Sequence, residues 1–221
     1  MPVYTTTDLF DLTKTIAQPL LSATQYPWEA LADIGGFILR TGPQLPAENF
    51  DHPAEDIWIA KSAVVAPSAS ITGPCIIDEN AEIRHCAFIR GNAVVGKGAV
   101  VGNSCELKNS ILFDCVQVPH FNYVGDSVLG YKAHFGAGCI TSNVKSDKSL
   151  VVVKNGEDSV KTERKKVGAL VGDWVEVGCN SVLNPGCVLG RESQIYPVSC
   201  VRGTVPANCI YKSSGQICPK V

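Results

Sequence analysis

The stretch VPHFNYVGD, residues 118–126, places a histidine, an asparagine and a tyrosine within four positions. Imidazole titrates near neutral pH, so His120 is a candidate general base for a proton that must be removed at pH 7. A lone histidine is more often structural than catalytic, but the side chains of Asn122 and Tyr123 could converge with it on one ligand. We therefore predict a catalytic site at His120.

Two cations could bind an anion near this stretch. Arg90 and Lys108 are 18 residues apart, and each directly follows a branched apolar residue of the repeat described next. In a coil of 18 residues they would lie on the same face, one layer apart, where two positive charges repel by roughly 1 kcal/mol or more. A bound anion would relieve this repulsion, so the spacing predicts a phosphate site. Unrelated surface charges are the alternative.

A six-residue repeat must position these side chains. It starts at Ile59, and a small residue usually follows four positions after each branched apolar one; a second run extends from Val171 to Val201. A period of six fits neither a helix nor the alternation of a strand, and it is typical of a parallel β-helix, in which three hexapeptides form one coil. We therefore predict an all-β fold. The apolar members of the first run are Ile59, Val65, Ile71, Ile77, Ile83, Ile89, Val95, Val101 and Leu107.

The repeat slips twice before the second run begins, first around residues 111–124 and then at residues 141–170. The second slip is an insertion of about residues 144–168. It carries an Asn155-Gly156 turn between two β-prone segments, which predicts a hairpin with a two-residue loop. The insertion is also rich in Lys and Arg, so it is either a solvated loop or a flap that meets an anionic ligand.

Residues 1–50 lack the repeat, and we predict that they form a helical arm laid against the first coils, as an end cap. One helix would start at Thr7 and end at Pro19. A second would start near Pro27 and weaken at Gly35-Gly36. The β-helix domain would then span residues 51–211, and residues 212–221 would form a C-terminal tail.

The ten cysteines contain no CxxC pair, so the sequence predicts no metal site. Three of them, Cys75, Cys105 and Cys187, fall on the small position of the repeat. A thiol at such a position packs as a compact apolar group.

The net charge of −2 gives no electrostatic reason to expect nucleic acid or an anionic membrane as a partner. No apolar run approaches the ~18 residues that a membrane-spanning helix needs. The N-terminus also lacks a basic region that leads into an apolar stretch, so we expect no signal peptide and a cytoplasmic protein.

The element VPHFNYVGDSVLG, followed by HFGAGCITSN, resembles the acetyltransferase domain of the bifunctional N-acetylglucosamine-1-phosphate uridylyltransferase / glucosamine-1-phosphate N-acetyltransferase family. The resemblance covers about residues 55–210. It implies a left-handed coil and a homotrimer with active sites between subunits. It also implies an N-acetyltransferase that takes acetyl-CoA as co-substrate and an amino sugar 1-phosphate as acceptor.

The resemblance assigns roles to individual residues. His120 matches the base that takes a proton from the sugar amine, and Ala137 matches a position whose backbone N–H stabilises the tetrahedral oxyanion. Lys148 is the nearest candidate for a lysine that follows the family's asparagine. The residues expected to hold the sugar or the reacting groups are Tyr123 and Asn143, those expected at the sugar phosphate are Arg90, Lys108 and Lys148, and those expected along the coenzyme A groove are Ala137, Cys179 and Pro197.

The sequence departs from this family at two further places. His134 and Phe135 replace an Asn-Ile pair, which would alter the acceptor pocket, and no GxGTR-like motif for a nucleoside triphosphate is present. We therefore expect only the acetylation activity, with a separate nucleotidyltransferase as a possible partner. Two alternatives stay open. One is a non-catalytic sugar-binding or scaffold subunit, and the other is a zinc-dependent lyase of the γ-carbonic-anhydrase kind, which needs three histidines, whereas this sequence has no H-x₄-H pair.

Overall fold

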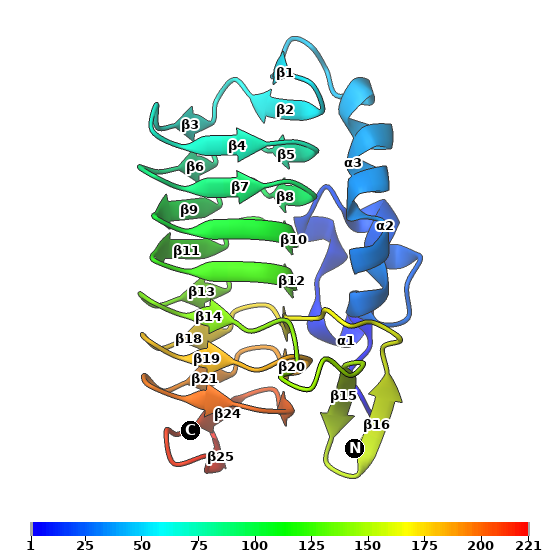
Figure 1. Ribbon diagram of the computed structural model, residues 1–221, viewed down its shortest axis with the longest axis vertical. Helices are drawn as coiled ribbons and strands as arrows, with labels where there is room; N and C mark the ends of the chain where they lie inside the picture. Colours follow the sequence, from blue (N-terminus) through cyan, green and yellow to red (C-terminus); the bar gives the residue numbers. More distant parts are fainter. Residues whose placement is uncertain (1, 221) are drawn as a thin grey trace.

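The six-residue repeat folds into a parallel β-helix, as the sequence predicts. The structure is a computed structural model that describes residues 2–220, and Figure 1 shows the coils stacked along the long axis with the helical segments on one side. Residues of the repeat such as Ile83, Ile89 and Val101 point into the coil and are at most 1% exposed. Neighbouring coils pair in register, for example at Ile83 and Val101.

The coil has three faces. We call the face that carries Arg90 and Lys108 the site face, the face covered by the helical segments the arm face, and the remaining one the third face. The site face consists of β4 (Ser70–Thr72), β7 (Phe88–Arg90), the first parts of β10 (Glu106–Leu112) and β12 (Tyr123–Leu129), β14 (Ile140–Thr141), β19 (Val182–Leu183) and β22 (Cys200–Val201).

The arm face consists of β1 (Phe50–Ala54), β2 (Ile57–Ala60), β5 (Cys75–Ile77), β8 (Ala93–Val95), the second parts of β10 and β12, β17 (Ala169–Val171), β20 (Cys187–Leu189) and β23 (Thr204–Val205). The third face consists of β3 (Val64–Val65), β6 (Glu82–Ile83), β9 (Val100–Asn103), β11 (Gln117–His120), β13 (His134–Phe135), β18 (Glu176–Val177), β21 (Gln194–Ile195), β24 (Cys209–Tyr211) and β25 (Ile217–Pro219). Among the described strands of these three faces, only β1 and β25 join their neighbours antiparallel, at the two ends of the stack.

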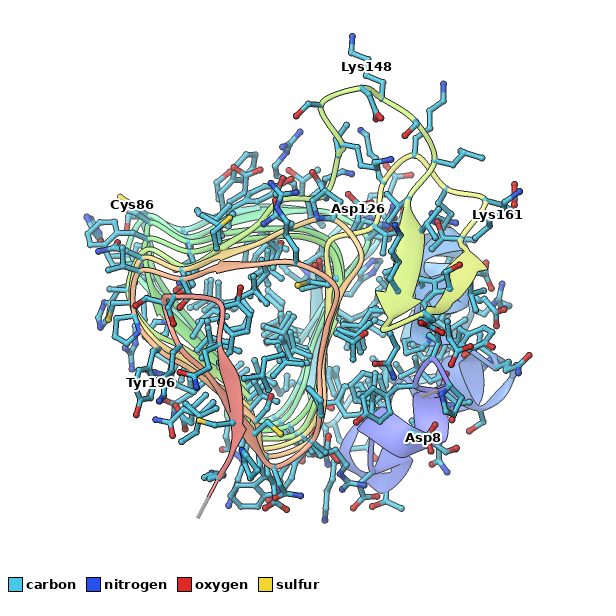
Figure 2. All side chains as sticks on the ribbon, turned by 90° about the horizontal axis from the view of Figure 1, so that it is seen from below. Asp8, Cys86, Asp126, Lys148, Lys161 and Tyr196 are labelled. Carbon is cyan, nitrogen blue, oxygen red and sulfur yellow. The ribbon has the colours of Figure 1, made fainter. Side chains whose placement is uncertain are left out.

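The coil is left-handed. Seen from the C-terminal end in Figure 2, the chain turns clockwise from the corner at Cys86 to the corner at Asp126 while it advances toward the viewer. The same corner as Cys86 recurs in later coils, because Ser104 N–H donates to the His85 carbonyl and Phe121 N–H donates to the Asn103 carbonyl.

The first slip of the repeat is a shortening of two coils by one residue each. Leu107 pairs with Val124, which lies 17 residues later rather than 18, and Tyr123 likewise pairs with Ile140. In both coils the strand continues through the corner between the site face and the arm face, so β10 and β12 are the longest strands described. The corners lie at Asn109 and Asp126, each with φ of +49°, a backbone conformation that these two residue types tolerate better than most.

The helical arm runs along the whole arm face and not only against the first coils. The Tyr4 hydroxyl accepts a hydrogen bond from the backbone of Ala207 near the last coils, at 3.1 Å. At the opposite end, α3 packs on β5 and β8. The arm consists of α1 (Thr6–Leu9), η1 (Leu12–Lys14), α2 (Gln18–Ser22), η2 (Pro27–Ala32), α3 (Ile34–Thr41) and η3 (Gly42–Gln44). Within residues 2–220 no helix is long and apolar enough to cross a membrane.

Two details of the predicted arm are wrong. Pro19 does not end a helix but lies in the first turn of α2, where a missing backbone donor costs nothing. The helix that begins at Pro27 is the 3-10 helix η2, which already ends at Ala32, and Gly35 and Gly36 lie in the first turn of the separate helix α3. The helix passes so close to β8 that a Cβ atom on Gly35 would lie 2.5 Å from the Asn92 side-chain oxygen, so tertiary packing explains this glycine.

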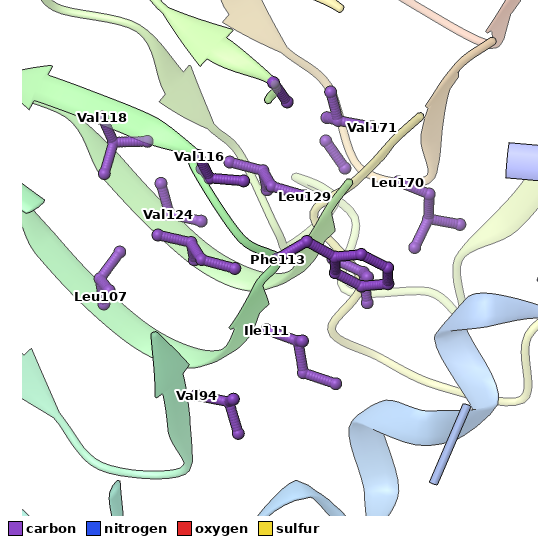
Figure 3. Packing of buried hydrophobic residues seen from close by; sticks show 14 of the residues in the cluster. Val94, Leu107, Ile111, Phe113, Val116, Val118, Val124, Leu129, Leu170 and Val171 are labelled. Carbon is purple, nitrogen blue, oxygen red and sulfur yellow. The ribbon is translucent and has the colours of Figure 1, made fainter. Parts of the chain in front are cut away.

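The arm explains why the strands of the arm face are apolar at consecutive positions. In β8, both the inward Val95 and the outward Val94 are fully buried, and in β17 Leu170 is buried as well. Figure 3 shows Val94, Ile111 and Leu170 pointing away from the inside of the coil. A strand buried on both sides needs a continuous apolar run, whereas β7 on the site face alternates exposed and buried residues.

The insertion forms the predicted hairpin, with β15 (Val152–Asn155) and β16 (Asp158–Lys161) paired antiparallel. Its two-residue loop is Gly156-Glu157, one position later than predicted, and Gly156 has φ of +63°. The hairpin packs on the β-helix, because Val151 and Val153 are fully buried. The segment of residues 145–150, which leads into the hairpin, projects from the coils, with Lys148 at its tip in Figure 2.

Candidate active site

His120 ends β11 at the corner where the third face meets the site face. Its backbone carbonyl accepts a hydrogen bond from Gly138 N–H at 3.0 Å, so the next coil fixes this corner. The residue is exposed, and no hydrogen bond within residues 2–220 uses its imidazole. The ring is therefore held at a rigid corner and is free to bind a ligand.

Asn122 supports this corner and does not face a ligand, contrary to our expectation that it converges with the imidazole. The residue is 2% exposed. Its side-chain amide donates to the carbonyls of Gly136 and Cys139, at 2.9 and 3.3 Å, and its oxygen accepts from His120 N–H at 3.1 Å. These bonds join two coils and hold the backbone of His120 in place.

Arg90 and Lys108 lie on the site face one coil apart, as the spacing predicts, because Ile89 pairs with Leu107. The predicted repulsion between them is relieved differently from what we expected. Arg90 forms an ion pair with Glu106 at 2.6 Å, and Lys108 forms one with Asp126 at 3.0 Å. Both cations are thus already neutralised by carboxylates of the same chain.

Asp126 is the centre of a buried hydrogen-bond network at the shortened corner. It is 2% exposed, and its carboxylate accepts from Lys108 Nζ at 3.0 Å, from Asn109 Nδ2 at 2.9 Å and from Asn143 Nδ2 at 2.6 Å. The donors come from the preceding coil and from the following one. Asp126 therefore fixes the orientation of both Lys108 and Asn143.

Tyr123 is joined to the same network. Its hydroxyl accepts a hydrogen bond from Asn143 Nδ2 at 3.2 Å. Partial burial raises the pKa of this phenol, and the negative charges of Asp126 and Glu106 act in the same direction. Its ring lies over Gly125, where a Cβ atom would come within 2.4 Å of the hydroxyl. A glycine at position 125 thus leaves the space that the phenol occupies.

The three positions expected along the coenzyme A groove continue the corner of His120 through the following coils. Asn180 N–H donates to the Ala137 carbonyl, and Val198 N–H donates to the Cys179 carbonyl, so Ala137, Cys179 and the residues around Pro197 are stacked in that order. Cys179 and Pro197 are exposed. The backbone N–H of Ala137 has no partner among the described residues.

Lys148 is the one expected site residue that the structure does not bring near the others. It is exposed at the tip of the loop that follows Asn143, beyond the corner at Asp126 in Figure 2. The basic residues 164–166 of the same insertion do come close. Together with Asp126 and Glu163 they line an open depression of about 360 Å³.

His134 lies on the third face with its Nδ1 within hydrogen-bond distance of Glu176 Oε2, at 2.7 Å, while Phe135 is fully buried in the core. Neither side chain lies on the site face. The two residues that differ from the family that the sequence resembles therefore belong to the adjoining face. Glu106 and Asp126, by contrast, belong to the site but were not singled out from the sequence. The available signal was the spacing, because Glu106 follows Arg90 by 16 residues and Asp126 follows Lys108 by 18, so each carboxylate falls about one coil after its cation.

The buried thiols behave as packing groups. Burial raises the pKa of Cys75 and of Cys187 to about 12, and that of Cys139 to about 11. Among residues 2–220, no three His, Cys, Asp or Glu side chains are grouped closely enough to hold a metal ion. The described residues therefore offer a base, hydrogen-bond donors and charged side chains as their chemical groups.

Known proteins resemble a large part of this chain. It is 35% identical over 172 residues to the bifunctional protein GlmU of Methanococcus maripaludis, which covers 77% of this chain and 42% of that protein. It is 32% identical over 159 residues to a bifunctional sugar-1-phosphate nucleotidylyltransferase/acetyltransferase of Sulfurisphaera tokodaii, covering 64% and 40%. The chain thus spans about two fifths of the length of these relatives.

Solved structures resemble the chain more distantly. The polySia specific acetyltransferase NeuO matches with a TM-score of 0.47 at 12% identity, covering 76% of this chain and 88% of that one. The acetyltransferase domain of PglB from Neisseria gonorrhoeae matches with a TM-score of 0.35 at 12% identity, covering 74% and 57%. The family model described as the GMPPB C-terminal domain matches residues 71–213. Because this match includes well over half of the residues, the chain belongs to the family of the GMPPB C-terminal domain.

Proposed function

We propose that this chain transfers the acetyl group of acetyl-CoA to the amine of an amino sugar 1-phosphate. One observation carries the proposal: the unpartnered imidazole of His120 lies one coil from the unpartnered N–H of Ala137, on the same corner. A base next to a backbone N–H donor is the arrangement that acyl transfer to an amine requires. The exposed corner continues past Cys179 and Pro197, which gives an extended thioester substrate a path along the coils.

In the proposed reaction, the amine nitrogen attacks the carbonyl carbon of the thioester while His120 accepts a proton from it. The Ala137 N–H donates to the oxygen that becomes negative in the tetrahedral intermediate, a contribution that is typically worth about 3–4 kcal/mol. The C–S bond then breaks, and the sulfur of coenzyme A leaves with the bonding electrons. It takes the proton from the imidazolium, which restores neutral His120.

The site face would bind the acceptor. Tyr123 and Asn143 present a hydroxyl and an amide to the sugar, and Arg90 and Lys108 present cations to its phosphate. Since both cations are already paired with carboxylates, the phosphate would have to share Arg90 with the half-exposed Glu106. Asp126 is buried and stays with Lys108. We therefore expect the contact between the phosphate and Arg90 to be the weakest contact of the acceptor with the site.

Two further cations, on the insertion, suggest how one subunit would contribute to the acceptor site of another. Lys148 and Lys165 are exposed on the insertion and have no ion-pair partner within the described part of the chain. In a homotrimer with sites between subunits, such a loop could bring a cation to the acceptor site of a neighbour. The relative from Sulfurisphaera tokodaii is both a nucleotidylyltransferase and an acetyltransferase, which supports acetyl transfer here and a separate nucleotidyltransferase as partner.

A thiol-release assay with acetyl-CoA and a panel of glucosamine and galactosamine phosphates tests the proposal. His120→Ala and His120→Asn are expected to lower kcat by at least about a hundredfold, because a general base contributes that much or more. His52→Gln is the matched control, since that imidazole stacks on Trp58 in the first coil, with ring centroids 5.0 Å apart. Near-normal turnover in His120→Ala would refute the mechanism.

A coenzyme A titration by calorimetry distinguishes the proposed enzyme from the alternative, a non-catalytic sugar-binding or scaffold subunit. That alternative is favoured by the internal neutralisation of Arg90 and Lys108. It predicts no binding of coenzyme A and no thiol release from any acceptor of the panel. If the chain is the proposed enzyme, coenzyme A is expected to bind saturably, both to the wild-type chain and to His120→Asn.

A further inference from the structure

An exposed thiol lies against an imidazole on the same corner as His120, two coils closer to the first coil. Cys86 Sγ lies 3.3 Å from His85 Nε2, and His85 Nδ1 lies 2.6 Å from Ser68 Oγ. A nucleophile within hydrogen-bond reach of a base, which is itself oriented by a third group, is the arrangement that activates cysteines and serines in covalent catalysis. The acetyl-transfer proposal uses none of these three residues.

The stacking of coils holds this arrangement in place. Cys86 N–H donates to Ser68 Oγ at 3.2 Å, so the preceding coil fixes the serine beneath the thiol. The following coil fixes the histidine, because its carbonyl accepts from Ser104 N–H at 3.1 Å and from Asn103 Nδ2 at 3.2 Å. When His85 Nδ1–H donates to Ser68, Nε2 presents its lone pair to the thiol.

The other thiols of the chain lack this environment. Cys75, Cys105, Cys139 and Cys187 are buried. Cys179 and Cys200 are exposed, but neither has an imidazole within hydrogen-bond distance among the described residues. Cys200 Sγ accepts a hydrogen bond from the Asn184 amide at 3.3 Å, which makes it an exposed, hydrogen-bonded thiol without a base.

We propose that Cys86 is a nucleophilic thiol that undergoes thiol–disulfide exchange with small disulfides, with His85 as its base and Ser68 as the orienting group. His85 Nε2 takes the thiol proton, and Cys86 Sγ attacks one sulfur of the disulfide. A bond forms between the protein and that sulfur, and the original S–S bond breaks. The second sulfur leaves as a thiolate and takes the proton from His85, so the disulfide is the oxidant and no other reactant is needed.

Labelling of the full chain with substoichiometric 2,2′-dithiodipyridine tests the proposal. After acid quenching, peptide mass spectrometry gives the rate at each cysteine. Cys86 is expected to react about tenfold faster than Cys200 at pH 7, since both are exposed but only Cys86 has a base. A Cys86 rate within twofold of the Cys200 rate would overturn the proposal, and this comparison within the wild-type chain needs no variant.

Two variants identify the role of the base. His85→Gln is expected to bring the Cys86 rate to within about twofold of the Cys200 rate and to make the pH profiles of the two thiols coincide. Ser68→Ala is expected to cause a smaller loss in the same direction, because the imidazole loses its orienting partner. An unchanged Cys86 rate and pH profile in His85→Gln, with an unchanged Tm, would show that the imidazole does not act as the base. These rates do not depend on acetyl transfer, so this proposal and the proposed function can fail separately.

Discussion

Replacing Asp126 with alanine would leave three hydrogen-bond donors without their acceptor at the corner between the site face and the arm face. The side chain of Asp126 is 3% exposed, and the partners of its carboxylate are Lys108, Asn109 and Asn143. The ammonium of Lys108 would lose its counter-ion where water reaches only part of the side chain, which is 25% exposed. The substitution therefore leaves an uncompensated, partly buried charge.

The expected loss of folding stability follows from this burial. Breaking a buried ion pair by removing one partner costs about 3–5 kcal/mol. Because water can still solvate part of Lys108, we take the lower end, about 3 kcal/mol. For a chain of about this length, 1 kcal/mol shifts the Tm by roughly 2–4 °C, so Asp126→Ala is expected to lower the Tm by about 6–12 °C.

Differential scanning calorimetry measures the shift, and Asp147→Ala is the matched control. Asp147 accepts hydrogen bonds from Ser149 N–H and Oγ and lies 3.6 Å from Lys145, but its side chain is 64% exposed. An exposed pair contributes about 1 kcal/mol or less, so this variant is expected to stay within about 4 °C of wild type. Equal shifts for the two variants would refute the assignment of the effect to burial. The double variant Asp126→Ala/Lys108→Met is expected to lose less than the sum, because it removes the stranded charge.

Three further substitutions test other parts of the structure. Burial raises the pKa of Asp78, whose Oδ2 has no partner among the described residues, so charging it as the pH rises costs stability. Asp78→Asn should therefore raise the Tm at pH 8, with the gain vanishing toward pH 4; a gain at both pH values would contradict this. Gly125→Ala should displace the Tyr123 ring and lower kcat/KM in the acetyl-transfer assay about tenfold or more, with little change in Tm, and unchanged kinetics would argue against a role for the phenol. Phe113→Ala should cost about 3–5 kcal/mol in urea unfolding, since the ring is fully buried against Phe10; a loss below about 1 kcal/mol would contradict close packing there.

The repeat was sufficient to predict the coil and the placement of the cations, because a period of six fixes which residues point inward. Ile89 and Leu107 are fully buried, and the residues that follow them, Arg90 and Lys108, stack as predicted. The carboxylate partners could not be predicted in the same way. The corner is one residue shorter than the period, so Lys108 pairs with Gly125 and Asp126 lies at the corner directly after it, a register that a strict period of six does not predict.

The path of the arm could not be predicted from the arm's own sequence either. Its helices are short, and they could have packed on any of the three faces. The available signal lay in the strands and not in the arm. Segments such as AVV at 93–95 and ALV at 169–171 have apolar residues on both sides of the strand, and these strands lie on the arm face. Comparing outward positions between faces would have identified the covered face.

The arm changes how the coils depend on one another. In a solenoid each coil contacts only its neighbours, so the ends can open while the middle stays folded. Here a single segment bonds to the backbone of Ala207 near one end and packs on β5 near the other, which couples coils that never touch. During synthesis the residues of the arm leave the ribosome before any coil exists, yet the surface that Tyr4 binds is made among the last. Helix α3 can pack on β5 and β8 soon after these strands are made, whereas the Tyr4 end of the arm can dock only after nearly the whole stack has been translated.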